Sequence, residues 1–334
     1  MVIILHSAAN YFYELGPRWM ASNIIDSLVR PCVPLFFMIS GALLLRRGAI
    51  EGFFCFLKNR YCRIICPLVF WSSLACFSYV YFKNESPVYF ILRLFATTGF
   101  YHLWYLYALV GLYALLPIIG KWYVNSSKAE ILFFLGIWFC VCSGSTMTEL
   151  INKITGKNVD ILNLYNVREF ASYMGFMVLG ALLFEERNNY INKCPRAEIF
   201  LLLFAVVGLL TAAVTYAVSM KLSEPCGIFY SYRAPLVITA SFLYFIYALR
   251  IKFDSNSILL RCVSVISQYS LGIYCVHAFV LYAATKSILP RIQGVLTNFW
   301  KTSLAILAMS ISVLLISLAI SMLFKRIPLL KKVV

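Results

Sequence analysis

The chain has 334 residues, of which 62% are hydrophobic and 13% charged, and its formal net charge at pH 7 is +16. Soluble globular domains carry about 25% charged residues, so the composition excludes a soluble protein and indicates an integral membrane protein. In such a chain the excess of Lys and Arg marks loops that lie at anionic headgroups. We therefore expect membrane lipids, and no nucleic acid, as the partners of these charges.

Apolar runs recur along the chain with polar breaks between them. Only helices or closed barrels cross a bilayer, and these runs do not alternate as barrel strands do, so each is predicted to be a helix. The predicted fold is all-α: a polytopic membrane protein of about ten transmembrane helices of about 20 residues each, in a single transmembrane domain over residues 1–334. The expected spans are 1–14, which is too short to cross alone, and 29–45, 64–82, 103–119, 131–146, 168–184, 198–220, 233–250, 266–286 and 302–324.

The basic residues of the loops predict the direction of these helices. If the N-terminus is cytoplasmic, the loops assigned to the cytoplasm hold more of the Lys and Arg than the outer loops do, and the basic tail RIPLLKKVV agrees. The positive-inside rule then predicts that both termini lie in the cytoplasm.

The first apolar run, MVIILHSAAN, carries a histidine, His6. An ionisable side chain is expensive in lipid, so an intramembrane histidine is a candidate functional residue, and a neutral imidazole suits proton abstraction from a hydroxyl group. The residues that follow, Ser7 to Asn10, are small or polar and let a substrate approach closely. The alternative is a histidine that is hydrogen-bonded between helices.

The second and third spans carry small and basic residues. Ser40 and Gly41, in VPLFFMISG, permit close contact between helices, and the residues alone indicate a packing helix. Arg60 and Arg63, in RYCR, are three residues apart and therefore share one helical face. Two guanidinium groups on one face suit phosphate binding, although anchoring at the cytoplasmic surface is the commoner role of such residues.

Two further histidines lie in or beside apolar runs. His102 and Trp104 open the fourth span in FYHLW. Aromatic residues at this position usually form an interfacial belt, and a functional role for His102, in binding the face of a sugar or lining a cavity, is an equally good interpretation. His277 lies within the ninth span in YSLGIYCVHA, and a structural hydrogen bond between helices is its commoner role.

Carboxylates are scarce within the expected spans. Asp26 and Glu169 lie at the outer starts of two helices, where either could orient a histidine, although capping of the helix end is the commoner role. The lack of an acidic relay argues against an ion-coupled pump. The eleven cysteines include no CxxC pair and lie mostly in apolar runs. We expect them to behave as small hydrophobes, with no essential disulfide and no metal site.

Several motifs recur in a specific order: LHS, VPLFFMISG, RYCR, FYHLWYL and YSLGIYCVHA. In this order, and over nearly the full length, the chain resembles the membrane acyltransferase-3 family of bacterial O-acyltransferases. The resemblance implies a ten-helix fold in the bacterial inner membrane, multi-pass, with a cytoplasmic C-terminus. It implies that acetyl is taken from cytosolic acetyl-CoA and placed on a sugar hydroxyl of a lipid-linked or cell-surface glycan, of the enterobacterial common antigen type.

The resemblance also implies roles for particular residues. His6 falls at the essential histidine of the family's first helix, and Arg60 and Arg63 fall at the Arg-x-x-Arg pair that contacts coenzyme A. Ser40 or His102 is expected to steady the oxyanion, and Trp104 and His277 are expected to line the substrate cavity. The catalytic hypothesis is that His6 acts as a general base on the acceptor hydroxyl or briefly carries the acetyl group itself.

One feature departs from the family pattern. The family has an arginine about eleven residues, or three helical turns, before the essential histidine, and only five residues precede His6 here. We expect that Met1 is an internal methionine and that about fifteen residues lie upstream, because the first run is too short to cross a bilayer. The alternative is a real truncation with lost activity.

A second function remains open: a carrier or flippase that moves a lipid-linked sugar without making a bond. Its signature would be a broken helix pair or charges near the midplane of the bilayer. The sequence shows neither pattern, which favours the enzyme.

Overall fold

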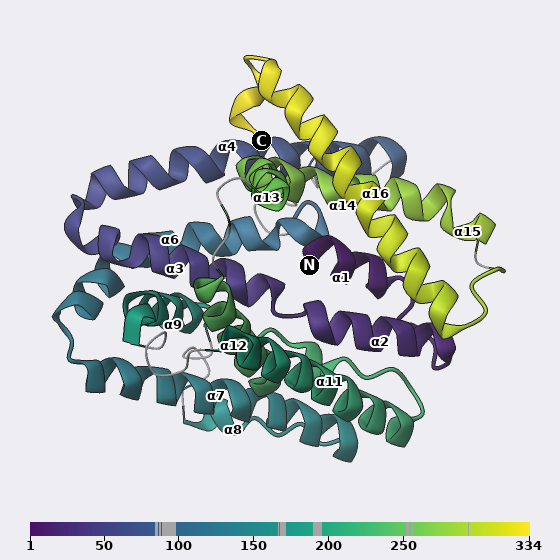
Figure 1. Ribbon diagram of the computed structural model, residues 1–334, viewed down its shortest axis with the longest axis horizontal. Coiled ribbons are helices and arrows are strands. Elements are labelled where there is room, and N and C mark those ends of the chain that lie inside the picture. Colours follow the sequence, from purple (N-terminus) through teal and green to yellow (C-terminus); the bar gives the residue numbers. More distant parts are fainter. Residues whose placement is uncertain are drawn as a thin grey trace. The chain divides into compact units, whose positions relative to one another are not determined.

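The fold was analysed in a computed structural model. It describes the chain except residues 84–85, 87, 89–97, 166, 168–171, 190–195, 252–253, 255–256 and 293. The described residues form α-helices and short 3₁₀ turns joined by loops, without a strand among them (Figure 1). The predicted all-α, polytopic membrane fold is therefore confirmed.

Each expected span coincides with a helix or a helix pair. The helices are α1 (Val2–Ala9), α2 (Pro17–Val29), α3 (Cys32–Ile50), α4 (Phe53–Lys83), α6 (Trp104–Asn125), α7 (Lys128–Thr155), α8 (Ile161–Leu164), α9 (Met174–Glu185), α11 (Ala197–Leu222), α12 (Pro235–Arg250), α13 (Ile258–Gln268), α14 (Ser270–Ser287), α15 (Leu289–Ile292) and α16 (Phe299–Arg326). The 3₁₀ turns are η1 (Tyr101–Leu103), η3 (Ile228–Tyr230) and η4 (Leu330–Lys332).

Within the described residues, six helical segments are long and apolar enough to cross a bilayer, and the pair α13–α14 makes a seventh if it forms one span. α2 and α3 together count as one of the six, over Pro17–Ile50. α1, α4 and α9 coincide with the remaining expected spans but are not among these seven. The pair α13–α14 is bent by 75° at its break.

The chain packs as two compact units, each built from separate stretches of sequence. Unit 1 holds Met1–Arg46, Gly120–Lys252 and Arg291–Ala308, and unit 2 holds Arg47–Ile119, Phe253–Pro290 and Met309–Val334. The prediction of one domain over the whole chain stays a prediction, and each unit is described by itself.

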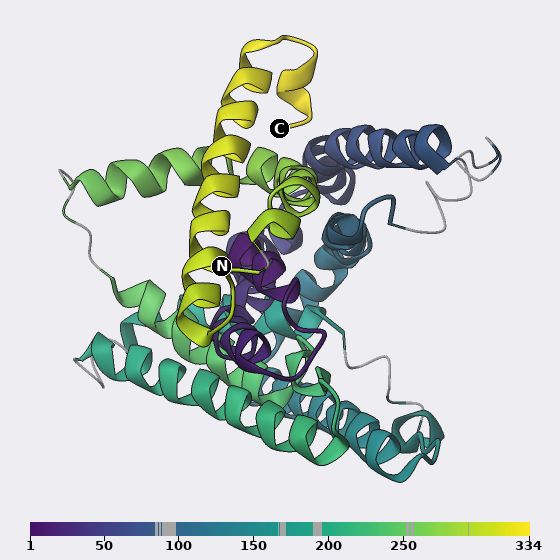
Figure 2. The same ribbon diagram turned by 90° about the vertical axis from the view of Figure 1, so that its right-hand side faces the viewer.

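Close backbone contacts between helices define the packing of unit 1. α11 lies alongside both α2 and α12, as Figures 1 and 2 show. A Cβ atom on Gly41 of α3 would lie 1.9 Å from the carbonyl oxygen of Met177 in α9, and one on Gly180 of α9 would lie 2.1 Å from that of Met38. Since neither position has room for a side chain, α3 and α9 cross at backbone contact, and the predicted role of VPLFFMISG as a packing segment is confirmed.

Ion pairs gather at one end of unit 1. Glu185, at the end of α9, accepts hydrogen bonds from the Nε of Arg46 at 2.5 Å and from the hydroxyl of Tyr123 at 3.1 Å. The next residue, Glu186, lies 3.0 Å from the ammonium group of Lys128 at the start of α7. The last turn of α3, the last turn of α6 and the first turn of α7 therefore meet at this end, which we name the ion-pair end.

Aromatic packing and the C-terminal residues organise unit 2. The indole nitrogen of Trp71 in α4 donates to the carbonyl of Val333, 2.9 Å away, and its ring stacks on Phe324 of α16. A Cβ atom on Gly272 would lie 2.7 Å from the Oγ of Ser321. Contacts between α4, α14, α16 and the last residues of the chain thus hold the unit together.

Candidate functional site

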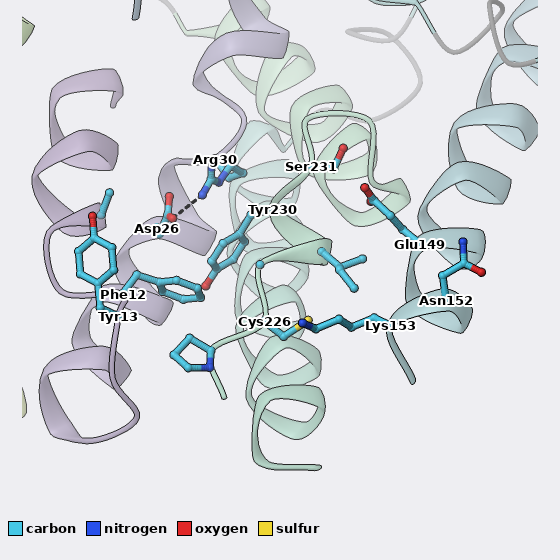
Figure 3. A pocket seen from close by; sticks show the side chains of 14 residues that line it. Phe12, Tyr13, Asp26, Arg30, Glu149, Asn152, Lys153, Cys226, Tyr230 and Ser231 are labelled. Atoms are coloured by element: carbon cyan, nitrogen blue, oxygen red, sulfur yellow. Dashed lines mark hydrogen bonds and ion pairs between the residues drawn. The ribbon is translucent and has the colours of Figure 1, made fainter. Parts of the chain in front are cut away.

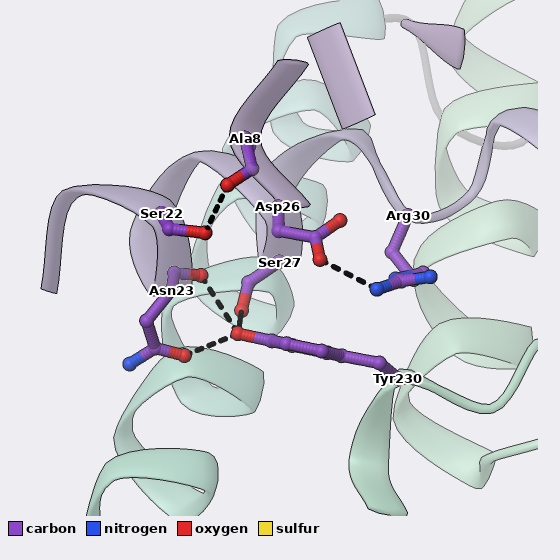
Figure 4. Close-up of polar contacts among 7 residues, drawn as sticks. All are labelled: Ala8, Ser22, Asn23, Asp26, Ser27, Arg30 and Tyr230. Carbon is purple, nitrogen blue, oxygen red and sulfur yellow. Dashed lines mark hydrogen bonds and ion pairs between the residues drawn. The ribbon is translucent and has the colours of Figure 1, made fainter. Parts of the chain in front are cut away.

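A buried ion pair lies in unit 1 where α2 meets α3. One carboxylate oxygen of Asp26 accepts a hydrogen bond from the Nη2 of Arg30, 2.5 Å away (Figure 4). Asp26 is only 2% exposed, and the side chain of Arg30 is 15% exposed. The guanidinium carbon of Arg30 also lies 4.6 Å from the ring centre of Tyr230, a cation–π distance. The arginine is therefore fixed by a carboxylate and an aromatic ring.

A hydrogen-bond network surrounds this pair. The hydroxyl of Tyr230 contacts the side-chain amide oxygen of Asn23 and lies 3.0 Å from the Asn23 carbonyl, while Ser27 donates to the hydroxyl at 3.4 Å (Figure 4). The amide nitrogen of Asn23 donates to the carbonyl of Ala212 in α11 at 3.0 Å. Polar residues of α2 are thus held by partners from α11 and η3, which is how buried polar groups are normally satisfied.

A cavity of about 900 Å³ opens beside the ion pair (Figure 3). We name it the Asp26 cavity. Its floor is formed by buried groups, and its rim by more exposed ones from the α1–α2 loop and the last turns of α7. The floor includes Asp26, Arg30 and Tyr230, and the rim includes Tyr13, Glu149 and Lys153.

The rim of the cavity is braced by polar contacts. Lys153 forms an ion pair with Glu224, in the loop after α11, at 2.5 Å. The side chain of Asn152 both donates to and accepts from the backbone of Val159, at 2.8 Å each. On the opposite wall the ring of Phe12 lies 5.2 Å from that of Tyr230. The rim is therefore fixed between α7, the loop after α11 and the α1–α2 loop.

The cavity and the ion-pair end lie at opposite ends of unit 1. α7 begins at the ion-pair end with Lys128 and reaches the rim of the cavity with Glu149 and Lys153. At 1.5 Å per residue this helix separates the two ends by about 32–38 Å, which is enough to span the hydrocarbon core of a bilayer, about 30 Å thick. α3 runs the other way: it begins at Cys32, two residues after Arg30, and carries Arg46 at the ion-pair end.

His6 lies near this cavity in sequence and on the helix. It is partly buried near the end of α1, and the side chain of Asn10 hydrogen-bonds to its carbonyl at 3.4 Å. Ala9, three residues later, lines the cavity, whereas His6 is not part of the lining. Residues three apart share a helical face, and side chains lean toward the helix N-terminus. His6 therefore precedes the cavity-lining residue Ala9 by about one turn of α1.

The structure brings the other two histidines together in unit 2. The ring centres of His102 and His277 are 5.1 Å apart, and the rings are nearly perpendicular. The Nε2 of His102 lies 3.2 Å from the carbonyl of Cys275, and the Nδ1 of His277 lies 2.6 Å from that of Tyr274. Because a carbonyl can only accept, each of these nitrogens carries a proton. Both rings are buried.

The remaining predicted residues lie apart from one another. Ser40 is partly buried in α3 of unit 1, and Trp104 begins α6 in unit 2. Arg60 and Arg63 lie on one face of α4 in unit 2; Arg63 is exposed, and Arg60 pairs with Glu51 at 3.8 Å. Within the part of the chain that the structure describes, the Nε of Arg60 is buried and has no hydrogen-bond partner, which leaves donor capacity for an anion such as a phosphate group. The assignment of these residues stays a prediction.

The expected position of Asp26 at a helix start is wrong. Residues Pro17–Val29 form a helix of their own, and Asp26 lies in its last turn, buried against Arg30. The spacing of four residues between a carboxylate and an arginine was the available signal, but nothing in the sequence pointed to Tyr230 or Asn23. Glu169 lies outside the described residues.

The structure corrects one part of the argument against a carrier. That argument relied on finding neither a broken helix pair nor charges near the midplane of the bilayer. The pair α13–α14 is bent by 75° at its break and is such a broken pair. The Asp26–Arg30 ion pair lies in the span Pro17–Ile50 just before α3 begins, and it does not test the second part.

Comparison with known proteins gives one match. A family model described as an acyltransferase domain, of the acyltransferase-3 type, matches residues 1–322. No curated protein and no solved structure shows significant similarity to the chain. The matched region includes all of unit 1 with the Asp26 cavity, and unit 2 except its last twelve residues, 323–334.

Proposed function

Because the chain belongs to the acyltransferase-3 family of membrane acyltransferases, we propose that it is an O-acetyltransferase that moves acetyl from cytosolic acetyl-CoA to a sugar hydroxyl of a cell-surface glycan. Among such glycans we propose one like the enterobacterial common antigen, on the motif resemblance given above. The observation that supports the proposal is that Ala9, three residues after His6 in α1, lines a polar cavity.

The proposed orientation places the ion-pair end in the cytoplasm. Several basic residues lie at that end, among them Arg46 and Lys128, as the positive-inside rule requires. The Asp26 cavity, about 32–38 Å away along α7, then opens at the outer face of the bacterial inner membrane. The C-terminus is proposed to lie in the cytoplasm. This arrangement supplies the donor from one side and the acceptor from the other.

The proposed chemistry is general-base catalysis. The imidazole of His6 takes the proton of the acceptor hydroxyl as its oxygen attacks the thioester carbonyl. The tetrahedral intermediate collapses with cleavage of the carbon–sulfur bond, and the imidazolium returns the proton to the departing thiolate. The products are the O-acetyl sugar and free coenzyme A. A variant of the scheme has His6 carry the acetyl group in an acyl-enzyme intermediate.

Other residues are proposed to bind and steady the reactants. Arg60 and Arg63 hold the phosphate groups of acetyl-CoA on the cytoplasmic side, because guanidinium groups form strong charge-assisted hydrogen bonds to phosphate. Ser40 is favoured over His102 as the oxyanion donor, because the Nε2–H of His102 is engaged with the carbonyl of Cys275. Trp104 and His277 remain proposed lining residues of the substrate path.

The test is mass spectrometry of the surface glycan from cells that carry the wild type or His6→Ala. We expect acetylation to fall by about a hundred- to ten-thousand-fold while the variant stays in the membrane at wild-type amount. Asn10→Ala, which alters the same helix end without removing the imidazole, is the matched control and should retain acetylation. Wild-type acetylation by His6→Ala would refute the catalytic role.

A carrier function is the second candidate, and the bent pair α13–α14 is the observation that favours it. Broken helices near the midplane line the binding sites of many transporters. The same mass spectra separate the two functions. A gain of acetyl on the glycan identifies an enzyme, and a glycan of unchanged mass that no longer reaches the cell surface when the gene is deleted identifies a carrier.

A further inference from the structure

We propose that the Asp26 cavity binds an uncharged, hydroxyl-rich sugar unit of the acceptor. This proposal rests on the proposed function for the presence of an acceptor glycan at this face. The cavity supplies the groups that a sugar requires: carboxylate oxygens that accept from hydroxyl groups, a guanidinium group that donates, and aromatic rings against which an apolar ring face packs.

One buried oxygen points to a missing hydrogen-bond donor. The Oδ2 of Asp26 accepts from Arg30, but its Oδ1 is buried and has no hydrogen-bond partner among the described residues, although Asp26 lines the cavity (Figure 3). A buried acceptor without a partner is costly and rare. A hydroxyl group of a ligand in the cavity would satisfy it. Because the carboxylate is held by Arg30, it is also fixed in position before the ligand arrives.

The aromatic residues lie where they would contact the faces of a sugar ring. Tyr230 forms part of the floor, held by its hydroxyl contacts to Asn23 and Ser27, and Phe12 packs beside it at 5.2 Å. Tyr13, on the rim, is 80% exposed. Binding sites that combine apolar surface with a few fixed polar groups are typical for small ligands, and they measure about 300–1,000 Å³. The volume of about 900 Å³ lies in this range.

The charges of the lining favour an uncharged sugar over an acidic one. Asp26 is paired with Arg30, and Lys153 with Glu224. Among the described residues, Glu149 on the rim has no ion pair. The lining itself holds two acidic and two basic side chains, and when Glu224, the partner of Lys153, is counted with them, Glu149 is left as one uncompensated negative charge. A uronic acid would meet this carboxylate and would find both basic side chains already engaged, whereas hydroxyl groups donate to it without repulsion.

The lining on α1 relates the cavity to the proposed catalytic residue. Ala9 forms part of the lining, and His6 precedes it by three residues, about one helical turn. A sugar unit seated on Asp26 and Tyr230 would thus place the neighbouring units of its glycan near α1 and His6. The cavity is a positioning site for the acceptor and takes no part in bond making.

The test is a binding measurement on the detergent-solubilised full chain without acetyl-CoA. The probes are N,N′-diacetylchitobiose, an uncharged disaccharide, and a disaccharide of the same size that contains glucuronic acid. Saturation-transfer NMR and calorimetry measure binding to the wild type, Asp26→Asn, Glu149→Gln and Glu198→Gln. Glu198 is an exposed carboxylate of the first turn of α11 that does not line the cavity, and its variant is the matched control.

The wild type is expected to bind the uncharged disaccharide at least about tenfold more tightly than the acidic one. Asp26→Asn should weaken binding of the uncharged disaccharide by about tenfold or more, the value of one hydrogen bond to a charged group. Glu149→Gln changes an exposed residue and should not disturb folding. It should weaken binding of the uncharged disaccharide several-fold and reduce the discrimination against the acidic probe. Glu198→Gln should bind both probes like the wild type.

Three results would overturn the proposal: wild-type protein that binds neither probe, equal binding of both probes, or Glu149→Gln indistinguishable from the wild type. None of these touches the proposed transferase activity, which acetylation of the glycan measures independently. Conversely, a wild type that binds the uncharged disaccharide but acetylates no glycan refutes the transferase and leaves the sugar site standing.

Discussion

Asp26 and Arg30 form an ion pair of 2.5 Å, one helical turn apart, at the junction between α2 and α3. Asp26 lies in the last turn of α2, where the negative end of the helix dipole disfavours a carboxylate. Arg30 offsets this in two ways. Its positive guanidinium group pairs with the carboxylate and opposes the negative end of the helix dipole, and its backbone N–H donates to the carbonyl of Asp26 and so caps the helix. The pair therefore fixes the geometry of the junction and the floor of the cavity together.

The Asp26–Arg30 pair predicts a specific pattern of stability. Arg30→Met leaves a buried carboxylate without its partner and is expected to lower the free energy of unfolding by about 3–5 kcal/mol. The double variant Asp26→Leu with Arg30→Met removes both charges and should recover most of this loss. Thermal unfolding followed by tryptophan fluorescence in detergent measures it. If the loss of unfolding free energy in the double variant equals the sum of the losses in the two single variants, the two side chains do not interact.

The crossing of α3 and α9 predicts that Gly41 tolerates no side chain. A Cβ atom there would lie 1.9 Å from the carbonyl oxygen of Met177, so Gly41→Ala must push two helices apart. We expect little monodisperse protein on size-exclusion chromatography. Gly136→Ala in α7 is the matched control, because a Cβ atom at Gly136 meets nothing within 4 Å. Equal yields of the two variants would contradict the crossing.

Helix positions were predictable because apolar runs must lie in lipid whatever their partners are. The exception is α2, whose sequence PRWMASNIIDSLV mixes polar and apolar residues, so hydropathy alone does not separate it from a loop. Its polar residues are satisfied by groups far away in the chain: Asn23 bonds to Ala212, and Tyr230 reaches back to Asn23. Such partners are 189 and 207 residues distant, and no spacing pattern reveals them.

The sequence could identify single residues with useful chemistry, but it could not predict which of them lie together. The rarity of histidine in apolar segments pointed to His102 and His277, but their contact, across more than 170 residues of sequence, follows from how α14 packs against η1. The Asp26 cavity was not predicted, because its lining comes from three segments that are distant in sequence: the α1–α2 region, the last turns of α7 and the segment from the end of α11 to η3. A hydropathy pattern does not indicate that these segments meet. Local sequence thus identifies candidate groups, while tertiary packing decides which groups share a site.

The proposed role of Arg60 and Arg63 predicts a change in donor affinity. Arg63→Ala is expected to raise the KM for acetyl-CoA by about tenfold or more, the value of a charge-assisted contact to phosphate, with kcat little changed. Lys58→Ala is the matched control, since Lys58 is exposed on another face of α4. Steady-state kinetics in proteoliposomes measures both constants. An unchanged KM for Arg63→Ala, or an equal increase for Lys58→Ala, would remove the basis for this assignment.

The two buried histidines predict opposite responses to amide substitution. The nitrogen of a Gln side chain reaches the position of Nε2, and that of Asn reaches the position of Nδ1. His102 donates through Nε2 and His277 through Nδ1, so His102→Gln and His277→Asn should retain their hydrogen bonds.

The exchanged variants, His102→Asn and His277→Gln, place the donor wrongly and leave buried polar groups unpaired, which costs about 1–3 kcal/mol each. Thermal unfolding in detergent should therefore rank His102→Gln above His102→Asn and His277→Asn above His277→Gln. The same two residues, Gln and Asn, are compared at both sites. A difference between them in volume or helix propensity would favour the same residue at both sites, so it cannot make Gln the better one at 102 and Asn the better one at 277. If Asn or Gln were better at both positions, the assigned ring nitrogens would be wrong.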